Sequence, residues 1–379
     1  MTPTPRAGAA SRGEIVVHVY GRSDVGRARE HNEDAFAVAD LTTGTVTLLA
    51  ESHTYRVGER GLLFMVADGM GGAAAGELAS AMAVDVVLDE LRARWGEAPK
   101  HDPETFAAGL RASTETANTK IHRFAADHPE HRGMGTTATI AGLLADTLYL
   151  AQVGDSRAYL VRDGVARQIT KDQSLMQKLI EAGEITAEEA ELSERRNIIL
   201  QALGPEPIIR TDLTHQHIRR GDTLVLCSDG LSGQIRIDDI GTAVTEERSL
   251  DAACTRLIDL ANANGGPDNI TVVAARFDGD GLAPPSARDP IGHAVYPLGG
   301  DQTPAMPIGK FMSSSPGLPT PPAASDDGAR PVMNAAFAPL PQTTTAEVRR
   351  GTPIMLTLGL LALAVLVALA AYRLVGSSP

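Results

Sequence analysis

The spacing of apolar runs constrains the fold of this chain more than any other feature. Six short runs have the length and composition of strands. They are IVVHVYG (15–21), LLFMVA (62–67), TLYLAQV (147–153), AYLVR (158–162), TLVLCS (223–228) and ITVVAARF (270–277). Several follow one another through short turns. Asp163-Gly164, between AYLVR and ARQI, is typical of a two-residue hairpin. Three stretches with helical period lie in blocks between them, at 84–95, 106–124 and 250–261. We therefore expect an α+β fold of antiparallel sheets with helices packed outside, rather than a doubly wound parallel sheet.

Composition divides the chain into three parts. Residues 14–278 hold the strand-like and helix-like stretches and should form the globular domain. Residues 1–13 lack the apolar run of a secretory signal, and we expect a short disordered tail there. Between 279 and 345 lie 13 of the chain's 23 prolines, with many Ala, Ser, Gly and Thr residues. Such a segment buries too little apolar surface to offset its ordering entropy, so we predict a flexible linker over 279–353.

The third part is an uncharged run, Ile354–Ala371, near the C-terminus. As a helix it would cross most of a hydrocarbon core of roughly 30 Å. A buried core helix is the alternative, but after a long linker it would have no domain to pack against. We predict one transmembrane helix at 354–372, with a short tail at 373–379. The flanking charges are Arg349, Arg350 and Arg373. Two charges before the run and one after it favour a cytoplasmic domain on the cell membrane.

The charge balance and the cysteines exclude some classes of protein. Lys and Arg number 34 and Asp and Glu 47, which gives a net charge of −13. An acidic chain is not expected to bind nucleic acid, and the excess can simply serve solubility. Cys227 and Cys254 form no CxxC pair and no zinc-finger spacing. Each lies in an apolar stretch, so we expect buried free thiols.

Five aspartates share one local context, because each borders a strand-like run and most lie beside or near glycine. They are Asp34, Asp68, Asp155, Asp229 and Asp268. A rigid scaffold positions residues at strand ends, and a neighbouring glycine lets a ligand approach closely. Gathered together, the carboxylates would repel one another unless hard cations such as Mg²⁺ or Mn²⁺ joined them. Two such ions can promote a phosphoryl displacement. A single Asp-Gly pair is more often a turn or helix cap, and the spacing alone leaves both interpretations open.

Taken in order, the motifs around these aspartates resemble the PPM family of metal-dependent protein serine/threonine phosphatases (type 2C), in its bacterial form. The matching pieces are SDVGRARxHNEDAF (23–36), VADGMGGAAAGELAS (66–80), GMGTTAT (133–139), AQVGDSRAYLVRDG (151–164), KDQSLMQKLIEAGEI (171–185), QALG (201–204), GDTLVLCSDGLSG (221–233) and GGPDNITVV (265–273). One DG or GDSR is a weak signal, whereas eight pieces in the family's order are specific. The resemblance covers about 14–278 and implies a four-layer αββα sandwich of two antiparallel sheets flanked by helices.

The resemblance also implies the ligands of two Mn²⁺ or Mg²⁺ ions and of a third, weaker one. Asp68 would bridge the first two ions, and the backbone carbonyl of Gly69 would bind the second. Asp229 and Asp268 would complete the first site. Asp155, with Asp229, matches the position of the third ion in bacterial members. A water that bridges two ions would then attack phosphorus in line, without a phosphoenzyme.

Other matching residues would act around the metals. Glu33 and Asp34 would act mostly through metal-bound waters. Arg29 would clamp the substrate phosphate, since a guanidinium gives bidentate hydrogen bonds to a phosphoryl group. Animal members carry a histidine where this chain has Met70, which leaves the general acid open, and a metal-bound water is the default. His31 lies next to the site motif and is expected to be a loop residue.

Two further segments carry structural expectations. Residues 174–199 match the family's flap, a small helical insert thought to influence substrate choice. Residues 41–60 are expected to form a longer hairpin.

The resemblance implies hydrolysis of phosphoserine and phosphothreonine on proteins, in signalling that opposes Ser/Thr kinases. Such kinases and their substrates would be the partners. The alternatives are a phosphatase for another class of phosphoester, a pseudophosphatase that binds phosphoproteins, and a membrane-tethered adaptor. A pseudophosphatase usually lacks a metal ligand, and none is missing here. An adaptor would leave the strand-end aspartates unexplained.

Overall fold

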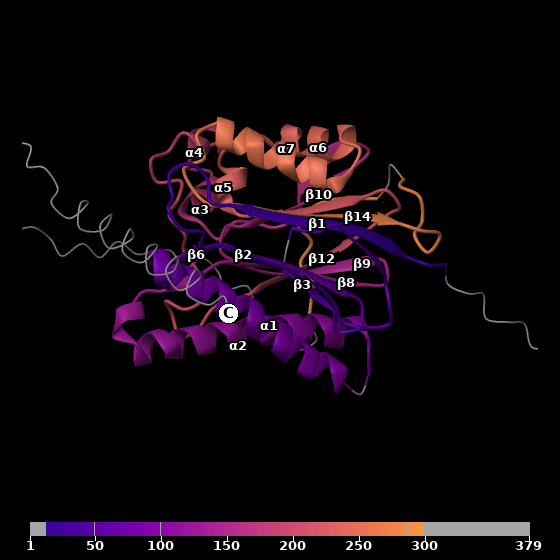
Figure 1. Ribbon diagram of the computed structural model, residues 1–379, viewed down its shortest axis with the longest axis horizontal. Coiled ribbons are helices and arrows are strands. Elements are labelled where there is room, and N and C mark those ends of the chain that lie inside the picture. Colours follow the sequence, from indigo (N-terminus) through magenta and orange to yellow (C-terminus); the bar gives the residue numbers. More distant parts are fainter. Residues whose placement is uncertain (1–12, 49, 99, 287–288, 299–379) are drawn as a thin grey trace, which may run out of the picture. The chain divides into compact units, whose positions relative to one another are not determined.

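Two six-stranded antiparallel sheets, packed face to face, form the centre of the domain (Figure 1). The computed structural model describes residues 13–48, 50–98, 100–286 and 289–298. In order across sheet A lie β11 (Val165–Gln168), β10 (Arg157–Arg162), β13 (Thr223–Cys227), β14 (Ile270–Asp278), β1 (Val16–Asp24) and β4 (His53–Arg56). In order across sheet B lie β12 (Asp212–His217), β9 (Thr147–Val153), β8 (Ala138–Leu144), β5 (Leu62–Ala67), β2 (Ala35–Asp40) and β3 (Val46–Thr47). A two-stranded ribbon joins β6 (Gly69–Met70) to β7 (Gly135–Thr136).

Helices cover the outer face of each sheet, so the domain has four layers (Figure 1). Sheet A carries α6 (Ile237–Glu246) and α7 (Leu250–Ala263), and sheet B carries α1 (Ala73–Gly96) and α2 (Pro103–Asp127). The shorter helices are α3 (Leu175–Glu181), α4 (Ala187–Glu191), α5 (Asp229–Ser232) and a 3₁₀ turn at Pro129–His131. The expected α+β architecture of antiparallel sheets flanked by helices is confirmed.

The central strands are buried on both faces, which explains why they read as continuous apolar runs rather than as alternating patterns. Every residue of β5 is buried. Leu63 and Met65 pack towards α1 and α2, whereas Leu62 and Phe64 pack between the two sheets. A third apolar layer lies between sheet A and α6 and α7, and it contains both cysteines. The thiols are free and buried, as predicted.

Local signals fix several element ends. Asp102 caps α2 by accepting the backbone N–H of Thr105 at 2.8 Å, and Ser249 caps α7 by accepting that of Ala252. The Asp163-Gly164 turn has positive φ at both residues, 50° and 80°, as a type I′ hairpin between β10 and β11 requires.

Residues 41–60 do not form the expected hairpin. Their two strands pair with different sheets, since β3 joins β2 in sheet B and β4 joins β1 in sheet A. The segment therefore links the two sheets at one edge of the sandwich.

The predicted linker also begins later than position 279. Beyond β14, backbone bonds join His215 to Ala294 and Tyr296 to Leu213, so this part of the chain runs beside β12. The side chain of Arg219 forms an ion pair with Asp289 at 2.8 Å. We call residues 279–286 and 289–298 the strap. Its Pro-, Ala-, Ser- and Gly-rich composition suggested a linker, but hydrogen bonds and the buried Leu282 hold it on the domain.

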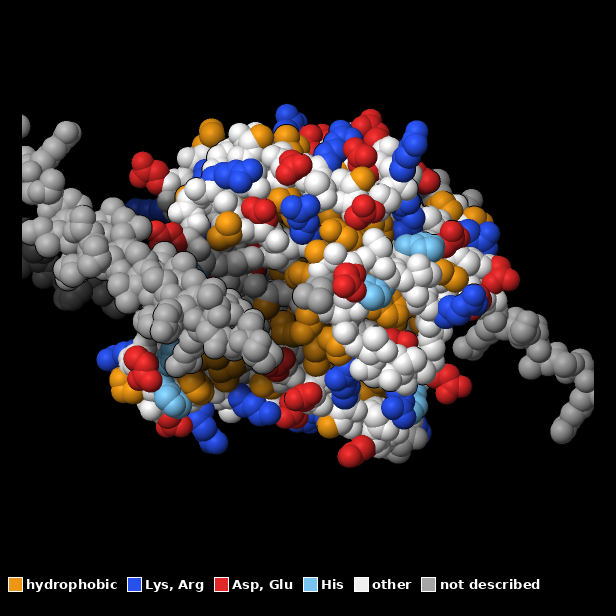
Figure 2. All heavy atoms as spheres, viewed as in Figure 1, with side chains coloured by type: hydrophobic (Ala, Val, Ile, Leu, Met, Phe, Trp, Pro, Cys, Tyr) orange, Lys and Arg blue, Asp and Glu red, His pale blue; other side chains and the backbone are white. Residues whose placement is uncertain are grey.

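None of the helices within the described part of the chain is both long and apolar enough to cross a bilayer. The run at 354–371, where a membrane helix is predicted, lies outside the described residues, as does the tail at 1–12. On the face of the domain seen in Figure 2, acidic and basic side chains are interspersed rather than gathered by sign.

Candidate metal centre

The five strand-end aspartates come to the same edge of the sandwich, because antiparallel strands begin and end there in turn. Asp68 and Asp229 follow β5 and β13, and Asp155 lies in the turn between β9 and β10. Asp34 precedes β2 and Asp268 lies just before β14. Their charges act on one another, since the other four all raise the pKa of Asp68. The structure therefore brings together the carboxylates that the sequence singled out.

Asp68 lies on a backbone that is fixed on both sides. Its N–H donates to Thr137 Oγ1 at 3.0 Å, and its carbonyl accepts the Thr137 N–H at 2.8 Å. Burial is the largest cause of its strongly raised pKa, followed by repulsion from Asp34 and Asp229. A carboxylate in these surroundings favours a proton or a cation.

Asp34 is held by one oxygen only. Its Oδ2 accepts hydrogen bonds from Ser228 Oγ at 2.8 Å and Thr271 Oγ1 at 2.7 Å. Its Oδ1 is buried and has no hydrogen-bond partner among the described residues. Burial raises the pKa of Asp34 to about 7, although the two hydroxyl bonds lower it. One oxygen thus orients the side chain and leaves the other free.

Asp155 repeats this pattern, and Asp229 adds charge beside it. Asp155 is buried, and its Oδ1 has no partner in the described part of the chain. Burial and the neighbouring Asp229 raise its pKa to about 7. Asp229 begins α5, and burial followed by repulsion from Asp268 raises its own pKa.

Asp268 differs because it already has a cationic partner. Arg29 Nη2 donates to Asp268 Oδ2 at 2.8 Å, and both side chains are partly exposed. This bond and the charge of Asp268 raise the pKa of Arg29. The predicted phosphate clamp therefore lies directly beside a predicted metal ligand.

Glu33 and Gly69 meet across the edge of the centre. Gly69 N–H donates to the Glu33 carbonyl at 3.2 Å, and the Ser80 hydroxyl donates to the same oxygen at 2.6 Å. A methyl group on Gly76 would lie 1.9 Å from Glu33 Oε2, so a larger residue there would displace the Glu33 carboxylate. Burial raises the pKa of Glu33. Met70, which pairs with Gly135 in the β6–β7 ribbon, brings no ionisable group to the centre.

Asn269 organises the loop that carries Arg29, and the sequence analysis missed it. Its Oδ1 accepts the N–H of Glu33 at 2.8 Å, and its Nδ2 donates to the carbonyls of Val25 and His31, both at 2.9 Å. His31 thus takes part through its backbone, as expected of a loop residue. The Asp-Asn pair before β14 was visible in the sequence, but its partners lie more than 200 residues away.

These residues fit a divalent cation. All the donors are oxygens, which suit Mg²⁺ and Mn²⁺, and two buried carboxylate oxygens lack partners. A cation would also remove the repulsion that raises the pKa values. Among the described residues, no three His, Cys, Asp or Glu side chains already stand as a complete binding set. Mg²⁺ usually keeps several waters and uses only one or two carboxylates, so such a set is not required.

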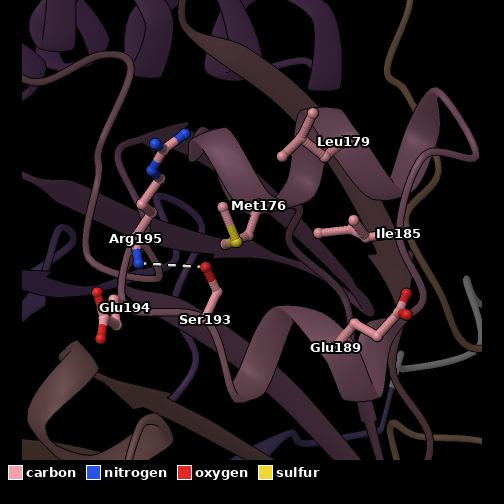
Figure 3. A pocket seen from close by; sticks show the side chains of 7 residues that line it. All are labelled: Met176, Leu179, Ile185, Glu189, Ser193, Glu194 and Arg195. Atoms are coloured by element: carbon pink, nitrogen blue, oxygen red, sulfur yellow. Dashed lines mark hydrogen bonds between the residues drawn. The ribbon is translucent and has the colours of Figure 1, made fainter. Parts of the chain in front are cut away.

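The flap is attached beside Asp155, as expected of a small helical insert next to the centre. Gln173 donates its N–H to the Gly154 carbonyl at 2.9 Å and accepts the Gly154 N–H at 3.0 Å. An isolated bridge between Ser174 and Ile199 closes the base of the flap. Figure 3 shows the hollow of about 390 Å³ between α3 and α4. It is lined by Met176, Leu179, Ile185, Glu189, Ser193, Glu194 and Arg195.

Comparison with known proteins gives one consistent result. A family model described as protein phosphatase 2C matches residues 48–272. The serine/threonine phosphatase stp of Listeria monocytogenes is 35% identical over 262 residues, which cover 69% of this chain and 96% of that protein. This chain belongs to the protein phosphatase 2C family. Its membership of the PPM group, expected from the motifs, is thereby confirmed.

Solved structures of protein phosphatase 2C relatives share the fold. The Mycobacterium tuberculosis phosphatase PstP/Ppp is 36% identical, with a TM-score of 0.58 over 69% of this chain and 99% of that one. The catalytic domain of PstP has also been solved with two manganese ions, at 36% identity and a TM-score of 0.56, over 70% of this chain and 99% of that one. The protein phosphatase 2C domain described here thus resembles one that holds two metal ions.

Proposed function

We propose that this chain is a protein serine/threonine phosphatase that uses Mn²⁺ or Mg²⁺ to hydrolyse phosphoserine and phosphothreonine on other proteins. One observation carries the proposal. Five aspartates from both sheets converge at one edge beside a partly exposed arginine, and four of them together raise the pKa of the fifth, Asp68. Family membership supports the same activity, because the curated relative is a serine/threonine phosphatase.

In this proposal Asp68, Asp229, Asp268 and the carbonyl of Gly69 hold two ions, and Asp155 serves a third. When bound, the ions supply Lewis-acid stabilisation to the phosphoryl group and to the attacking water. Each of these side chains is positioned by the end of a strand, so the oxygens are directed to one place before the ions arrive.

The remaining residues act on water and phosphate. Ser228 and Thr271 fix Asp34 Oδ2, so Asp34 Oδ1 is free to accept a hydrogen bond from a water. Glu33, the residue before Asp34, would likewise act through metal-bound water. Arg29 would bind the phosphoryl oxygens of the substrate, and its charge persists at any relevant pH.

The activity is tested with the full chain and a phosphothreonine peptide, in Mn²⁺, in Mg²⁺ and in EDTA. We expect phosphate release with either ion and none in EDTA. A small phosphoester such as p-nitrophenyl phosphate, run in parallel, separates a protein phosphatase from a general phosphoesterase. A folded chain that binds the peptide but releases no phosphate with any ion would contradict the proposal and indicate a pseudophosphatase. Phosphoproteins are then the partners, and the Ser/Thr kinases that modify them are the opposing enzymes.

We further propose that the chain is anchored in the cell membrane by residues 354–372, with its domain in the cytoplasm and a flexible linker between them. The uncharged run and the flanking arginines support this orientation. The full chain should sediment with membranes and resist extraction by salt, whereas a chain ending at Pro353 should stay in the supernatant. Protease added outside intact cells should leave the domain whole. Recovery of the full chain in the supernatant would contradict the anchor.

A further inference from the structure

A positively charged cavity lies at the end of α1 opposite the aspartate cluster. There the last turn of α1 meets the turn between β2 and β3 and the turn before β5, around a cavity of about 240 Å³. Its lining residues are Leu41, Thr42, Thr43, Gly44, Arg60, Arg92, Trp95 and Gly96. The lining includes two arginines and no acidic residue.

One donor of Arg92 lacks an acceptor among the residues that the structure describes. Its Nη2 donates to the Gly44 carbonyl at 2.8 Å, which holds the guanidinium at the cavity. Its Nε is buried and has no acceptor in the described part of the chain. A buried donor without an acceptor destabilises the fold, and more so when the group is charged. A bound acceptor would remove that cost.

Arg60 brings a second guanidinium to the same cavity. Its backbone is fixed on both sides, since its N–H donates to Thr42 Oγ1 at 3.1 Å and its carbonyl accepts the Trp95 indole N–H at 2.9 Å. Its side chain reaches towards the end of α1, where a methyl group on Gly96 would lie 3.7 Å from Arg60 Nη1. Because Thr42 Oγ1 accepts the Arg60 N–H, the Thr42 hydroxyl proton stays available for donation.

No carboxylate of the described residues pairs with either arginine, although ion pairs join many of the other basic side chains. The acidic residue on the same turn, Asp40, is already engaged, because its Oδ1 accepts the N–H groups of Thr42 and Thr43 at 2.8 and 3.2 Å. The negative end of the α1 dipole faces this region, and it amounts to only about half a charge against two full positive ones. The cavity keeps a net positive character.

We propose that this cavity binds a phosphate-type oxyanion between Arg60 and Arg92. Two guanidinium forks match the charge and the several acceptor oxygens of a doubly charged phosphoryl group, and the Thr42 hydroxyl adds a third donor. The volume suits inorganic phosphate or a single phosphoryl group on a side chain. The site is separate from the metal centre, because α1 has 24 residues and spans about 36 Å.

The chain offers a specific probe for this site. Trp95 is its single tryptophan, it is 2% exposed, and it lines the cavity. The full chain with Mg²⁺ is titrated with inorganic phosphate, and separately with a phosphothreonine peptide, while tryptophan emission is recorded. We expect a saturable change with inorganic phosphate. A change with the peptide alone would assign the site to phosphoryl groups carried on proteins, and either response supports the inference.

Variants connect the signal to the cavity. Arg92→Gln and Arg60→Gln should each weaken the apparent affinity about tenfold or more, since each removes a charged hydrogen bond. Arg94→Gln, on the same turn but exposed and paired with Glu90, is the matched control and should bind like the parent. Circular dichroism verifies that each variant is folded.

The inference is overturned if neither inorganic phosphate nor the peptide produces a saturable change, or if the change persists in both arginine variants. Hydrolysis of the phosphothreonine peptide should be unaffected by Arg92→Gln, which keeps this result independent of the proposed activity. Repeating the titration with Asp229→Asn removes any contribution of the metal centre and should leave the signal in place.

Discussion

Asp68→Asn should lower kcat/KM for a phosphothreonine peptide by about 10³-fold or more, equivalent to about 4 kcal/mol of transition-state stabilisation. Asp68 is the carboxylate on which the charges of all four other aspartates act. An amide keeps its size but not its charge, so the pair of ions that the proposal requires would be lost. Activity against Mn²⁺ concentration measures the effect, and excess Mn²⁺ should not restore the parent rate.

The same variant should become more stable in EDTA, because it removes one of several charges that repel one another. The pH dependence of this stability gain follows from the raised pKa values in the cluster. Burial moves those of Asp34 and Asp155 from 3.8 to about 7, so the metal-free folded state binds protons more tightly than the unfolded state. Metal-free stability should therefore fall as the pH rises from about 4 to about 7. Each kcal/mol recovered raises Tm by about 2 to 4 °C in a domain of this size.

Thermal unfolding of Asp68→Asn and its parent in EDTA, at about pH 5.5 and pH 8, tests this expectation. The variant should gain more at the higher pH, where more of the cluster is ionised. Asp259→Asn, an exposed change on α7, is the control and should alter neither activity nor stability. An Asp68→Asn chain that keeps the parent activity would contradict the proposed metal centre. One that is inactive but less stable in EDTA would indicate a structural role for Asp68 instead.

Arg162→Met should lower the free energy of unfolding by about 3 to 5 kcal/mol, since it leaves a buried carboxylate without its partner. Arg162 donates from Nε and Nη2 to the two oxygens of Asp222 at 2.8 and 2.6 Å, and the two side chains are only 6% and 1% exposed. Its Nη1 also donates to the Asp289 carbonyl at 3.1 Å, which ties the strap to sheet A. Urea unfolding measures the loss.

Two further variants show whether the loss of stability comes from the unpaired buried charge of Asp222 or from the substitution as such. Arg256→Met removes two exposed ion pairs on α7 and should leave the urea midpoint close to that of the parent. Arg162→Met combined with Asp222→Leu replaces the pair by apolar side chains and should recover much of the loss. A cost below about 1 kcal/mol for Arg162→Met alone would show that water reaches Asp222.

The metal centre was predictable because each of its aspartates carries a local signal. An acidic residue that directly borders an apolar strand is visible in a few neighbouring letters, as at Asp68 and Asp229. The antiparallel arrangement then brings such strand ends to one edge. Their roles as ligands stay predictions, since they depend on the resemblance to the family.

The supporting residues could not be found in the same way. Ser228, Thr271 and Asn269 act on residues more than 190 positions distant, and no local pattern records such pairing. Residues 41–60 were expected to form one hairpin, whereas β3 pairs with the preceding strand β2 and β4 pairs with β1 in the other sheet, and no local pattern records the second pairing. The strap was mistaken for linker because it is rich in Pro, Ala, Ser and Gly, and its few apolar anchors, such as Leu282 and Tyr296, meet their partners only in the fold.

The strap has a consequence for solubility. β12 is an outer strand of sheet B, and open outer strands can recruit a strand from another molecule and start aggregation. Ala294 and Tyr296 bond to the exposed side of β12 and so block that route. A chain cut at Asp278, where the motifs end, would leave β12 uncovered. Expression of the isolated domain should therefore extend through Leu298.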